Sequence, residues 1–292
     1  MKKFIITSDS SCDLTESQVK ALDVNCAYLS YTIGNDVFYD DMIESHIDNF
    51  YQKMRNGAVP QTSQVPPAQF EVFFKEAVKS NLPVLHISIS SALSGTYRSA
   101  CIAANEVMEE NPDADIRIID STVASAGLAM LIYEAVKYRD KGRSIEEALA
   151  HIEGIKAHIN TFVTTDDLSY MRRSGRVSMA GAIVSSVMKI SPLITLSHAG
   201  KLYVSAKIRG SKATLEKFIE NVKDSVVKPE AQTLYIVHAD AIDKAKEFGE
   251  KLKDRLGFKC VQYMKFGTTI GAHGGPGTIS AFYFGKLRPI RL

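Results

Sequence analysis

Residues 84–96 read Val84-Leu85-His86-Ile87-Ser88-Ile89-Ser90-Ser91-Ala92-Leu93-Ser94-Gly95-Thr96 and lead into a helical pattern over 97–110. The first six residues have the apolar character of a buried strand, so this is a strand-to-helix junction. Backbone N–H groups at a helix start and the helix dipole favour a negative group, and small hydroxyl side chains add donors. The junction predicts a seat for an anion, with simple capping of the helix by Ser or Thr as the alternative.

The same strand-then-helix order recurs through the first half of the chain. Strand patterns occur at 4–7, 84–89 and 116–119, and helical patterns at 67–79, 97–110 and 124–139. Repetition of this order predicts a parallel sheet with helices on both faces. Ligands of such sheets bind beyond the carboxyl ends of the strands, which is where residues 90–96 are expected to lie.

Beyond residue 142 the pattern changes. A capped helix is expected to about residue 158, then a strand at 161–164 and two short helices between roughly 167 and 190. The β-rich runs 193–196 and 202–208 flank a turn and predict an antiparallel pair. The sequence thus predicts an α/β fold of two domains. Residues 1–155 form an N-terminal domain with a parallel sheet flanked by helices, and residues 156–292 form a C-terminal α/β domain with a mixed, partly antiparallel sheet.

The composition of the chain argues against a nucleic-acid-binding protein, a metalloprotein and an integral membrane protein. The formal net charge is +2, and the Lys and Arg residues are dispersed along the chain, which disfavours nucleic acid as a partner. The four cysteines form no C-x-x-C pair and no acidic metal site is visible, so no metal centre is expected. The apolar run at the N-terminus is too short for a signal peptide, and the longest apolar stretches are too short to span a bilayer. We expect a cytoplasmic protein that is not an integral membrane protein.

Two further segments carry more polar or cationic residues than a core needs. Gln61-Thr62-Ser63-Gln64 is a polar loop ahead of a helix that begins with proline, and Thr62 or Ser63 either caps this helix or binds a ligand. Three arginines fall within 172–176. Cations stabilise a helix C-terminus, and an arginine fork also matches a carboxylate or a phosphate.

A glycine-rich run, Gly271-Ala272-His273-Gly274-Gly275-Pro276-Gly277, precedes the last predicted strand. Its glycines let other groups approach the backbone closely, and His273 is either a turn residue or a donor to an anion. A serine hydrolase acting on acyl esters, with Ser94 as nucleophile and His273 as base, is one interpretation. Its usual Gly-x-Ser-x-Gly elbow is absent, because Ala92 and Thr96 stand at the glycine positions.

Several motifs, in order along nearly the whole chain, resemble the DegV family. They are Asp9-Ser10-Ser11-Cys12-Asp13-Leu14, Thr62-Ser63-Gln64, Ser90-Ser91-Ala92-Leu93-Ser94-Gly95-Thr96-Tyr97-Arg98-Ser99-Ala100, Ile119-Asp120-Ser121, Arg172-Arg173-Ser174-Gly175-Arg176, Lys207-Ile208-Arg209-Gly210 and the 271–277 run. The resemblance implies two α/β domains, no cofactor, and a long-chain fatty acid such as palmitate as the ligand. It also implies that the acyl chain lies in an interior tunnel and the carboxylate at the domain junction.

The resemblance implies hydroxyl donors to that carboxylate. Thr62 and Ser94 match the family's positions for these donors, and Ser63, Gly95 and Thr96 are expected beside them.

A histidine and an arginine are implied to complete the carboxylate network. His273 matches the family's histidine, and the arginine comes from the 172–176 segment. Arg172 is the one we expect, while Arg176 matches the family's Gly-Gly-Arg signature. Ser174 stands where that signature has its first glycine.

The resemblance also implies partners. Family members that serve fatty acid kinase present the bound carboxyl group to a separate ATP-dependent kinase subunit and carry the acyl phosphate to a membrane acyltransferase. The chain itself is then a lipid-binding protein without catalytic residues.

Overall fold

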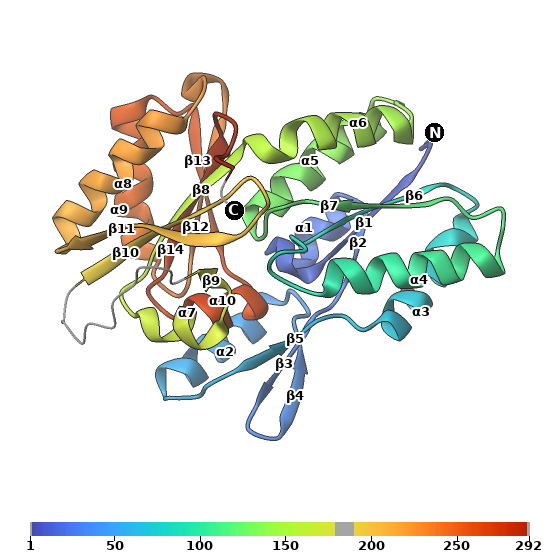
Figure 1. The fold of residues 1–292 in the computed structure, drawn as a ribbon, viewed down its shortest axis with the longest axis horizontal. Coiled ribbons are helices and arrows are strands. Elements are labelled where there is room, and N and C mark those ends of the chain that lie inside the picture. The colour runs from blue at the N-terminus through green and yellow to red at the C-terminus, as the bar shows by residue number, and fades with distance from the viewer. Residues whose placement is uncertain (1, 179–189, 291–292) are drawn as a thin grey trace. The chain divides into compact units, whose positions relative to one another are not determined.

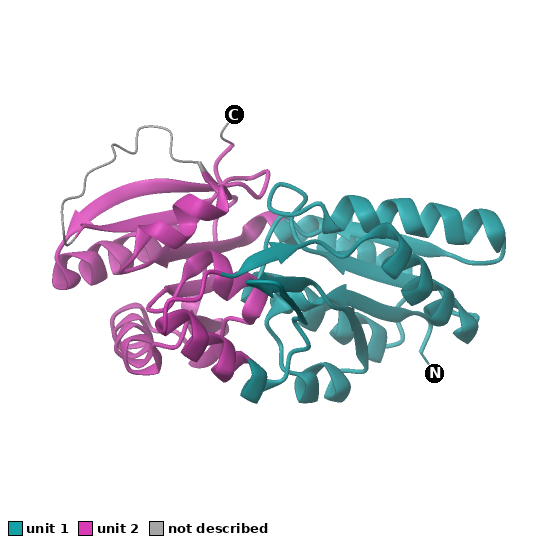
Figure 2. Cartoon of the chain, turned by 90° about the horizontal axis from the view of Figure 1, so that it is seen from below, with its two compact units in different colours: residues 1–46, 60–156 teal, residues 47–59, 157–292 magenta. Residues whose placement is uncertain are grey.

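The structure, a computed structural model, describes residues 2–178 and 190–290. The chain divides into two compact units, Met1–His46 with Pro60–Lys156 and Ile47–Val59 with Ala157–Leu292 (Figure 2). The division expected from the sequence assigned residues 47–59 to the N-terminal domain. In the structure this segment, most of it in helix α2 (Glu44–Arg55), groups with the second unit.

The first unit is built on a four-stranded sheet of parallel strands. In spatial order they are β2 (Val24–Ala27), β1 (Ile5–Asp9), β6 (Val84–Ser88) and β7 (Ile116–Asp120). The helices of this unit include α1 (Glu16–Ala21), α3 (Pro67–Ala77), α4 (Thr96–Glu110), α5 (Ala126–Asp140) and α6 (Ile145–Ile155). α3 and α4 pack together on one side of the sheet, and α5 with α6 lies on the other (Figure 1). The parallel sheet flanked by helices is thereby confirmed.

β6 runs through the centre of this core, and each of its residues is buried. His86, in the middle of β6, faces the rings of Phe70, Phe73 and Phe74, with ring centroids 5.2, 6.4 and 5.3 Å away. Its Nδ1 hydrogen-bonds to Thr7 Oγ1 at 3.0 Å, and its Nε2 has no hydrogen-bond partner in the described part of the chain. Burial lowers the pKa of His86 to about 3, so the ring is neutral at neutral pH.

A small antiparallel sheet belongs to the same unit. In spatial order its strands are β4 (Asp36–Tyr39), β3 (Ser30–Ile33) and β5 (Gln61–Ser63). A two-residue turn joins β3 to β4, and its first residue, Gly34, has a φ of 61° that favours glycine. Tyr31 of β3 pairs with Thr62 of β5. The polar run 61–64, expected as a loop, thus supplies a short strand.

The second unit contains a seven-stranded mixed sheet. In spatial order its strands are β13 (Cys260–Lys265), β12 (Thr233–His238), β14 (Ile279–Phe284), β8 (Ile159–Thr164), β10 (Ile190–Leu196), β11 (Leu202–Arg209) and β9 (Val177–Ser178). Its helices include α7 (Leu168–Ser174), α8 (Ser211–Ser225), α9 (Ile242–Leu256) and α10 (Thr268–Gly274). β10 and β11 pair antiparallel, which confirms the mixed sheet predicted for this half.

Two sequence expectations for this unit have different outcomes. Of the two short helices expected between residues 167 and 190, α7 is present, whereas the second falls largely on 179–189, outside the described residues. No helix was predicted for the glycine-rich run 271–277, yet its first half is helical. Residues 271–274 form the last turn of α10, where Gly271 lies against the Tyr51 side chain. Tertiary packing has overridden the low helix propensity of glycine here.

Within residues 2–178 and 190–290, no helix combines the length and apolar character needed to cross a bilayer.

Candidate functional site

The hydroxyl-rich turn ends where α4 begins, at Thr96. Ser94 Oγ accepts a hydrogen bond from the Thr96 backbone N–H at 3.2 Å and lies 2.9 Å from Thr96 Oγ1. The N-cap residue itself, Gly95, has no side-chain cap, and Ser94, one position earlier, satisfies the first N–H of the helix, which is a capping role of the kind that the simpler interpretation holds. A hydroxyl that accepts one bond still carries its own hydrogen, which can be donated to Thr96 Oγ1 or to an incoming anionic oxygen. Capping and ligand binding by Ser94 are compatible.

The polar segment 61–64 meets this turn in space. Val65 N donates to Thr96 Oγ1 at 3.4 Å, and Gln64 Nε2 donates to Ser99 Oγ at 2.8 Å. Gly95 lies beneath the Gln64 side chain, and a Cβ at this position would be 2.8 Å from Gln64 Cδ. Two segments about thirty residues apart, each singled out from the sequence, thus come together at the start of α4.

Gly95→Ala tests this contact. Gly95 has a φ of −71°, which any residue adopts, so the close approach of Gln64 is the only strain expected. We expect Gly95→Ala to displace Gln64, break its bond to Ser99 and lower the free energy of unfolding by about 1 kcal/mol. In a Gln64→Ala background the same change should be neutral or stabilise by about 0.5 kcal/mol, because the obstacle is gone. Urea unfolding of the four proteins checks this, and simply additive costs would refute the contact.

Two buried or partly buried carboxylates hold the loops at the carboxyl edge of the parallel sheet. Asp9, at the end of β1, accepts from Ser88 Oγ at 3.0 Å and from Ile89 N at 2.9 Å. Burial raises the pKa of Asp9, and its hydrogen bonds oppose that rise. Asp120, at the end of β7, accepts from Ser91 N at 3.1 Å. Asp9 thus holds residues 88–89 at the end of β6, and Asp120 holds Ser91 in the turn that follows.

Asp9 and Asp120 belong to the family motifs, but no role is predicted for them from the sequence. The available signal was their position, because each is the last residue of a strand and is followed by serine. An acidic residue at that place supplies an acceptor for the backbone N–H groups of the next loop.

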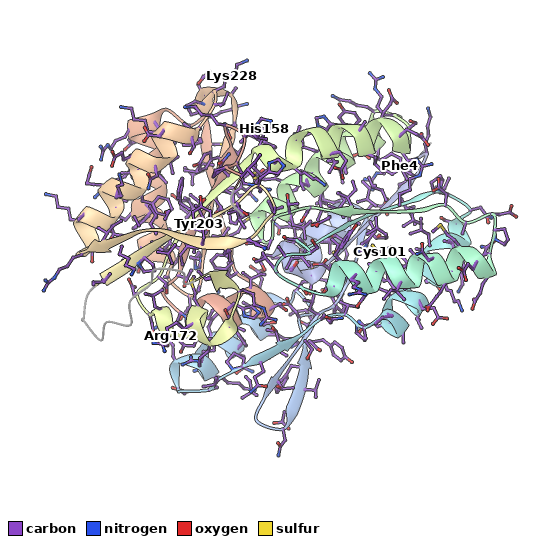
Figure 3. The ribbon with its side chains drawn as sticks, in the orientation of Figure 1. Phe4, Cys101, His158, Arg172, Tyr203 and Lys228 are labelled. Atoms are coloured by element: carbon purple, nitrogen blue, oxygen red, sulfur yellow. The ribbon has the colours of Figure 1, made fainter. Side chains whose placement is uncertain are left out.

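The arginine segment occupies the end of α7 in the second unit (Figure 3 labels Arg172). The helix ends at Gly175, whose φ of 66° is left-handed. Arg173 stacks over the Tyr170 ring at 4.7 Å, and Arg176 Nη1 donates to Ser174 O at 2.5 Å. Arg172 and Arg176 are exposed to solvent.

His273 lies in the last turn of α10, and α10 packs against α7. The contact is tight, because a Cβ on Gly275 would lie 2.5 Å from Tyr170 Cγ. Burial, together with the nearby charge of Arg176, lowers the pKa of His273 to about 4. At neutral pH the imidazole is therefore neutral and can donate one ring N–H. The histidine and arginine candidates thus come together within the second unit.

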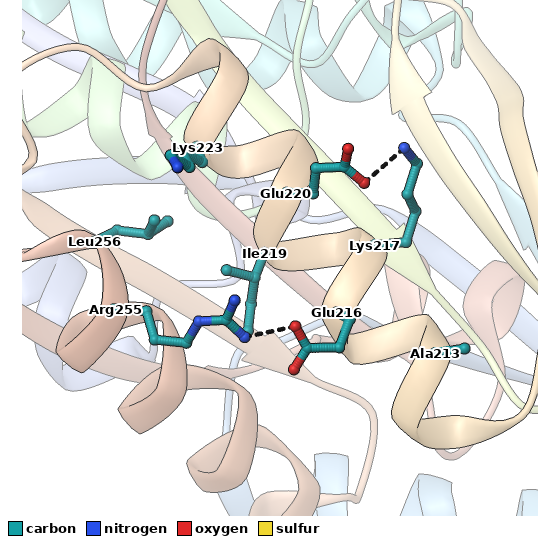
Figure 4. Close-up of a pocket in the computed structure, with 8 residues that line it drawn as sticks. All are labelled: Ala213, Glu216, Lys217, Ile219, Glu220, Lys223, Arg255 and Leu256. Atoms are coloured by element: carbon teal, nitrogen blue, oxygen red, sulfur yellow. Dashed lines mark hydrogen bonds and ion pairs between the residues drawn. The ribbon is translucent and has the colours of Figure 1, made fainter.

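A groove of about 680 Å³ lies between α8 and α9 (Figure 4). Its walls carry ion pairs, Arg255 with Glu216 and Lys217 with Glu220, both at 2.7 Å. Charged side chains on both walls do not suit an alkyl chain, because methylenes gain from burial only against apolar neighbours. This groove is not a candidate for an acyl chain.

Comparison with known proteins gives the family. Residues 3–286 match the family model described as uncharacterised protein, DegV family. The chain belongs to the DegV family. A DegV domain-containing protein of Clostridium perfringens is 37% identical over 290 residues, covering 99% of both chains. The expected family membership is confirmed.

Solved DegV structures share the whole fold. A DegV lipid-binding protein from Thermotoga maritima is 27% identical with a TM-score of 0.85, covering 98% of this chain and 99% of the other. A second Thermotoga maritima protein, described as revealing a fatty acid binding function, is 26% identical with a TM-score of 0.83, covering 97% and 100%. Among DegV proteins of this fold, some therefore bind lipids.

The candidate residues of this DegV protein fall into two groups. Thr62, Ser63, Ser94, Gly95 and Thr96 belong to the first unit, and Arg172, Arg176 and His273 to the second. Within the first unit the Ser94 hydroxyl bonds to Thr96 and to no described histidine of that unit. Its surroundings there are those of a helix cap and hydrogen-bond donor, and lack the adjacent base that activates a serine nucleophile.

Proposed function

We propose that this DegV protein binds a long-chain fatty acid, with the acyl chain in an interior tunnel and the carboxylate at the junction of its two domains. The observation that carries the proposal is the meeting of segments 61–64 and 94–99, which gathers hydroxyl and N–H donors at the start of α4. The Thermotoga maritima relatives described as lipid-binding and fatty-acid-binding support it.

The carboxylate takes its hydrogen bonds from both groups of candidates. Thr62 and Ser94 donate their hydroxyl hydrogens, and neutral His273 donates a ring N–H. Arg172 or Arg176 supplies the positive charge. Charge-assisted bonds of this kind contribute about 1.5 to 3 kcal/mol each, which offsets the cost of taking an ionised carboxylate out of water.

The acyl chain provides most of the binding free energy in this proposal. Burial of one methylene is favourable by about 0.8 kcal/mol, so the tail of a long-chain acid gains roughly 10 kcal/mol. The polar end then decides which lipid is chosen. An acid satisfies the donors, whereas an ester offers no negative charge to the arginine and histidine.

We further propose that the protein is the carrier subunit of a fatty acid kinase and has no cofactor of its own. It presents the carboxyl group to a separate ATP-dependent kinase subunit in the cytoplasm, and the acyl phosphate then passes to a membrane acyltransferase. A carrier role fits a serine whose hydroxyl, within its own unit, bonds to the start of α4 and to no described histidine.

Ser94→Ala tests the contact with the carboxylate. We expect the affinity for palmitate to fall about tenfold, because one charge-assisted hydrogen bond is lost, and the affinity for methyl palmitate to change little. Ser91→Ala is the matched control, since its hydroxyl lies in the same turn but is bonded to Asp120. Fluorescence displacement titrations measure both lipids. An equal loss for acid and ester would mean that Ser94 only caps the helix.

A further inference from the structure

The sequence around β3 and β4 contains many acidic residues and no Lys or Arg. Between Lys20 and Lys53 there is no Lys or Arg, yet six acidic residues occur, in a chain whose net charge is +2. They are Asp23, Asp36, Asp40, Asp41, Glu44 and Asp48. Asp36 lies on β4 itself and is exposed, and Asp41 and Glu44 follow within five residues of the end of that strand. Asp23 and Asp48 are paired with Lys2 and Lys265, and Asp40 is buried. The negative charge beside β4 therefore comes from Asp36, Asp41 and Glu44.

β4 is the edge strand of the small sheet and carries exposed apolar side chains. Val37 is 63% exposed and Tyr39 is 57% exposed. Asp40 N donates to Leu29 O at 2.9 Å, so in this antiparallel register the N–H and C=O groups of Val37 and Tyr39 point away from β3. Backbone groups at a sheet edge are a template for pairing with an added strand.

The same sheet leads from this edge to a proposed carboxylate ligand. Tyr31 of β3 pairs with Phe38 of β4 on one side and with Thr62 of β5 on the other. The Tyr31 and Phe38 rings stack, with centroids 5.3 Å apart, which stiffens the connection. Neighbouring strands are about 4.8 Å apart, so a strand added to β4 lies roughly 15 Å from the Thr62 backbone. A folded domain whose segment pairs with β4 is large enough to span this distance and reach the bound carboxyl group.

The charge favours one kind of occupant. A second copy of this chain would bring the same acidic residues to the edge, and like charges that face each other across strands are destabilising. An anionic membrane surface attracts basic segments and repels acidic ones. A protein segment that carries Lys or Arg fits both the acidic residues and the exposed apolar side chains.

We propose that the β4 edge, centred on Val37 and Tyr39, docks the protein that acts on the carboxyl group of the bound lipid, through an extended segment bearing Lys or Arg. This inference rests on the proposed function. The added strand pairs with the outward backbone groups of β4, the apolar side chains pack against it, and Asp36 attracts its basic residues.

The test uses the full-length protein loaded with radiolabelled palmitate and mixed with ATP, Mg²⁺ and the ATP-dependent kinase subunit from the same organism, so that the γ-phosphoryl group passes to the carboxylate and ADP is released. Hydroxylamine traps acyl phosphate as the hydroxamate, with release of phosphate. For Val37→Lys we expect the carrier concentration that gives half-maximal hydroxamate to rise about tenfold, since an apolar contact is replaced by a repelling charge. Palmitate affinity should not change. The matched control is Val72→Lys, because Val72 is equally apolar and 71% exposed on α3.

The possible outcomes distinguish failure of the docking inference from failure of the proposed function. Unchanged hydroxamate formation by Val37→Lys, or an equal effect of Val72→Lys, would overturn the docking inference alone. If the wild-type protein binds palmitate but gives no hydroxamate, the kinase role fails and the inference fails with it. If Val37→Lys instead abolishes a wild-type dimer in sedimentation, the edge belongs to a second copy and the inference is wrong. Asp36→Asn, which keeps the apolar contacts, should give a smaller, salt-sensitive loss.

Discussion

Gly275→Ala is expected to lower the free energy of unfolding of the second unit by about 2 to 4 kcal/mol. Two causes add up. Gly275 has a φ of 78° and a ψ of 161°, a combination that is essentially restricted to glycine and costs an alanine about 1 to 3 kcal/mol, and the new Cβ would collide with the Tyr170 ring. The ring carbons concerned are those next to the Tyr170 backbone, so α7 as a whole must shift.

Gly257→Ala is the control for a left-handed glycine without a collision. Gly257 has a φ of 77° and a ψ of 29°, which is the ordinary left-handed region, and nothing lies within 4 Å of a Cβ placed there. Its cost should be only about 1 kcal/mol. Tyr170→Ala in the Gly275→Ala background should remove the collision and leave the backbone strain. Thermal unfolding distinguishes these cases, and equal costs for Gly275→Ala and Gly257→Ala would contradict the packing of α7 on α10.

Gly275→Ala should also change the affinity for palmitate. A shift of α7 moves Arg172 and Arg176 relative to His273, which lies on α10. Gly275→Ala should therefore weaken palmitate binding, whereas Gly257→Ala, at the end of α9, should not.

The second large effect concerns His86 and acid. The folded-state pKa of His86 is about 3, below the ordinary value of 6.5, so the unfolded chain takes up the proton first as the pH falls. Its contribution to stability is complete above pH 6.5 and is lost progressively as the pH drops towards 3. One such group changes the free energy of unfolding by about 1.4 kcal/mol per pH unit, so roughly 3 kcal/mol is lost over two units.

His86→Gln tests this contribution. The variant cannot titrate, so its unfolding free energy should fall about 3 kcal/mol less than that of the wild type between roughly pH 6.5 and 4.5. At neutral pH the variant should be less stable than the wild type, because removal of the imidazole ring leaves a gap in the packing among Phe70, Phe73 and Phe74. Thr7→Val is the control. It removes the hydrogen bond to the ring but keeps the burial that lowers the pKa, so its pH dependence should match the wild type. A wild-type pH dependence in His86→Gln would show that other groups govern acid unfolding.

The regular elements of the fold could be predicted from the sequence because their patterns are local. The strand at 84–89 is a continuous apolar run and the helix after it begins at a hydroxyl-rich turn, and the structure has β6 and α4 there. β5 was missed because three polar residues give no strand pattern, and only pairing with β3 makes Gln61–Ser63 a strand. The grouping of residues 47–59 with the second unit likewise depends on contacts far along the chain. Tyr51 OH donates to Phe266 O at 2.9 Å, across 215 residues.

The candidate site could be predicted in part for the same reason. Hydroxyl, glycine and arginine clusters are visible in the sequence, and the structure brings segments 61–64 and 94–99 together. The place of Asp9 and Asp120 at the ends of strands could be predicted from the sequence, but the loops that they hold could not, because these depend on which segments meet at the edge of the sheet. The use of Arg173 in stacking on Tyr170 was also hidden, since a run of arginines does not reveal which one faces a ring.

Fatty acid binding is the central claim, and native mass spectrometry tests it most directly. Purified protein, before and after lipid removal, is measured alone and with added palmitate or oleate. We predict a single bound acyl chain per protein molecule, recovered by extraction from the untreated sample and restored by the added acid. Absence of any acyl ligand after purification, together with no uptake of palmitate or oleate, would contradict the account.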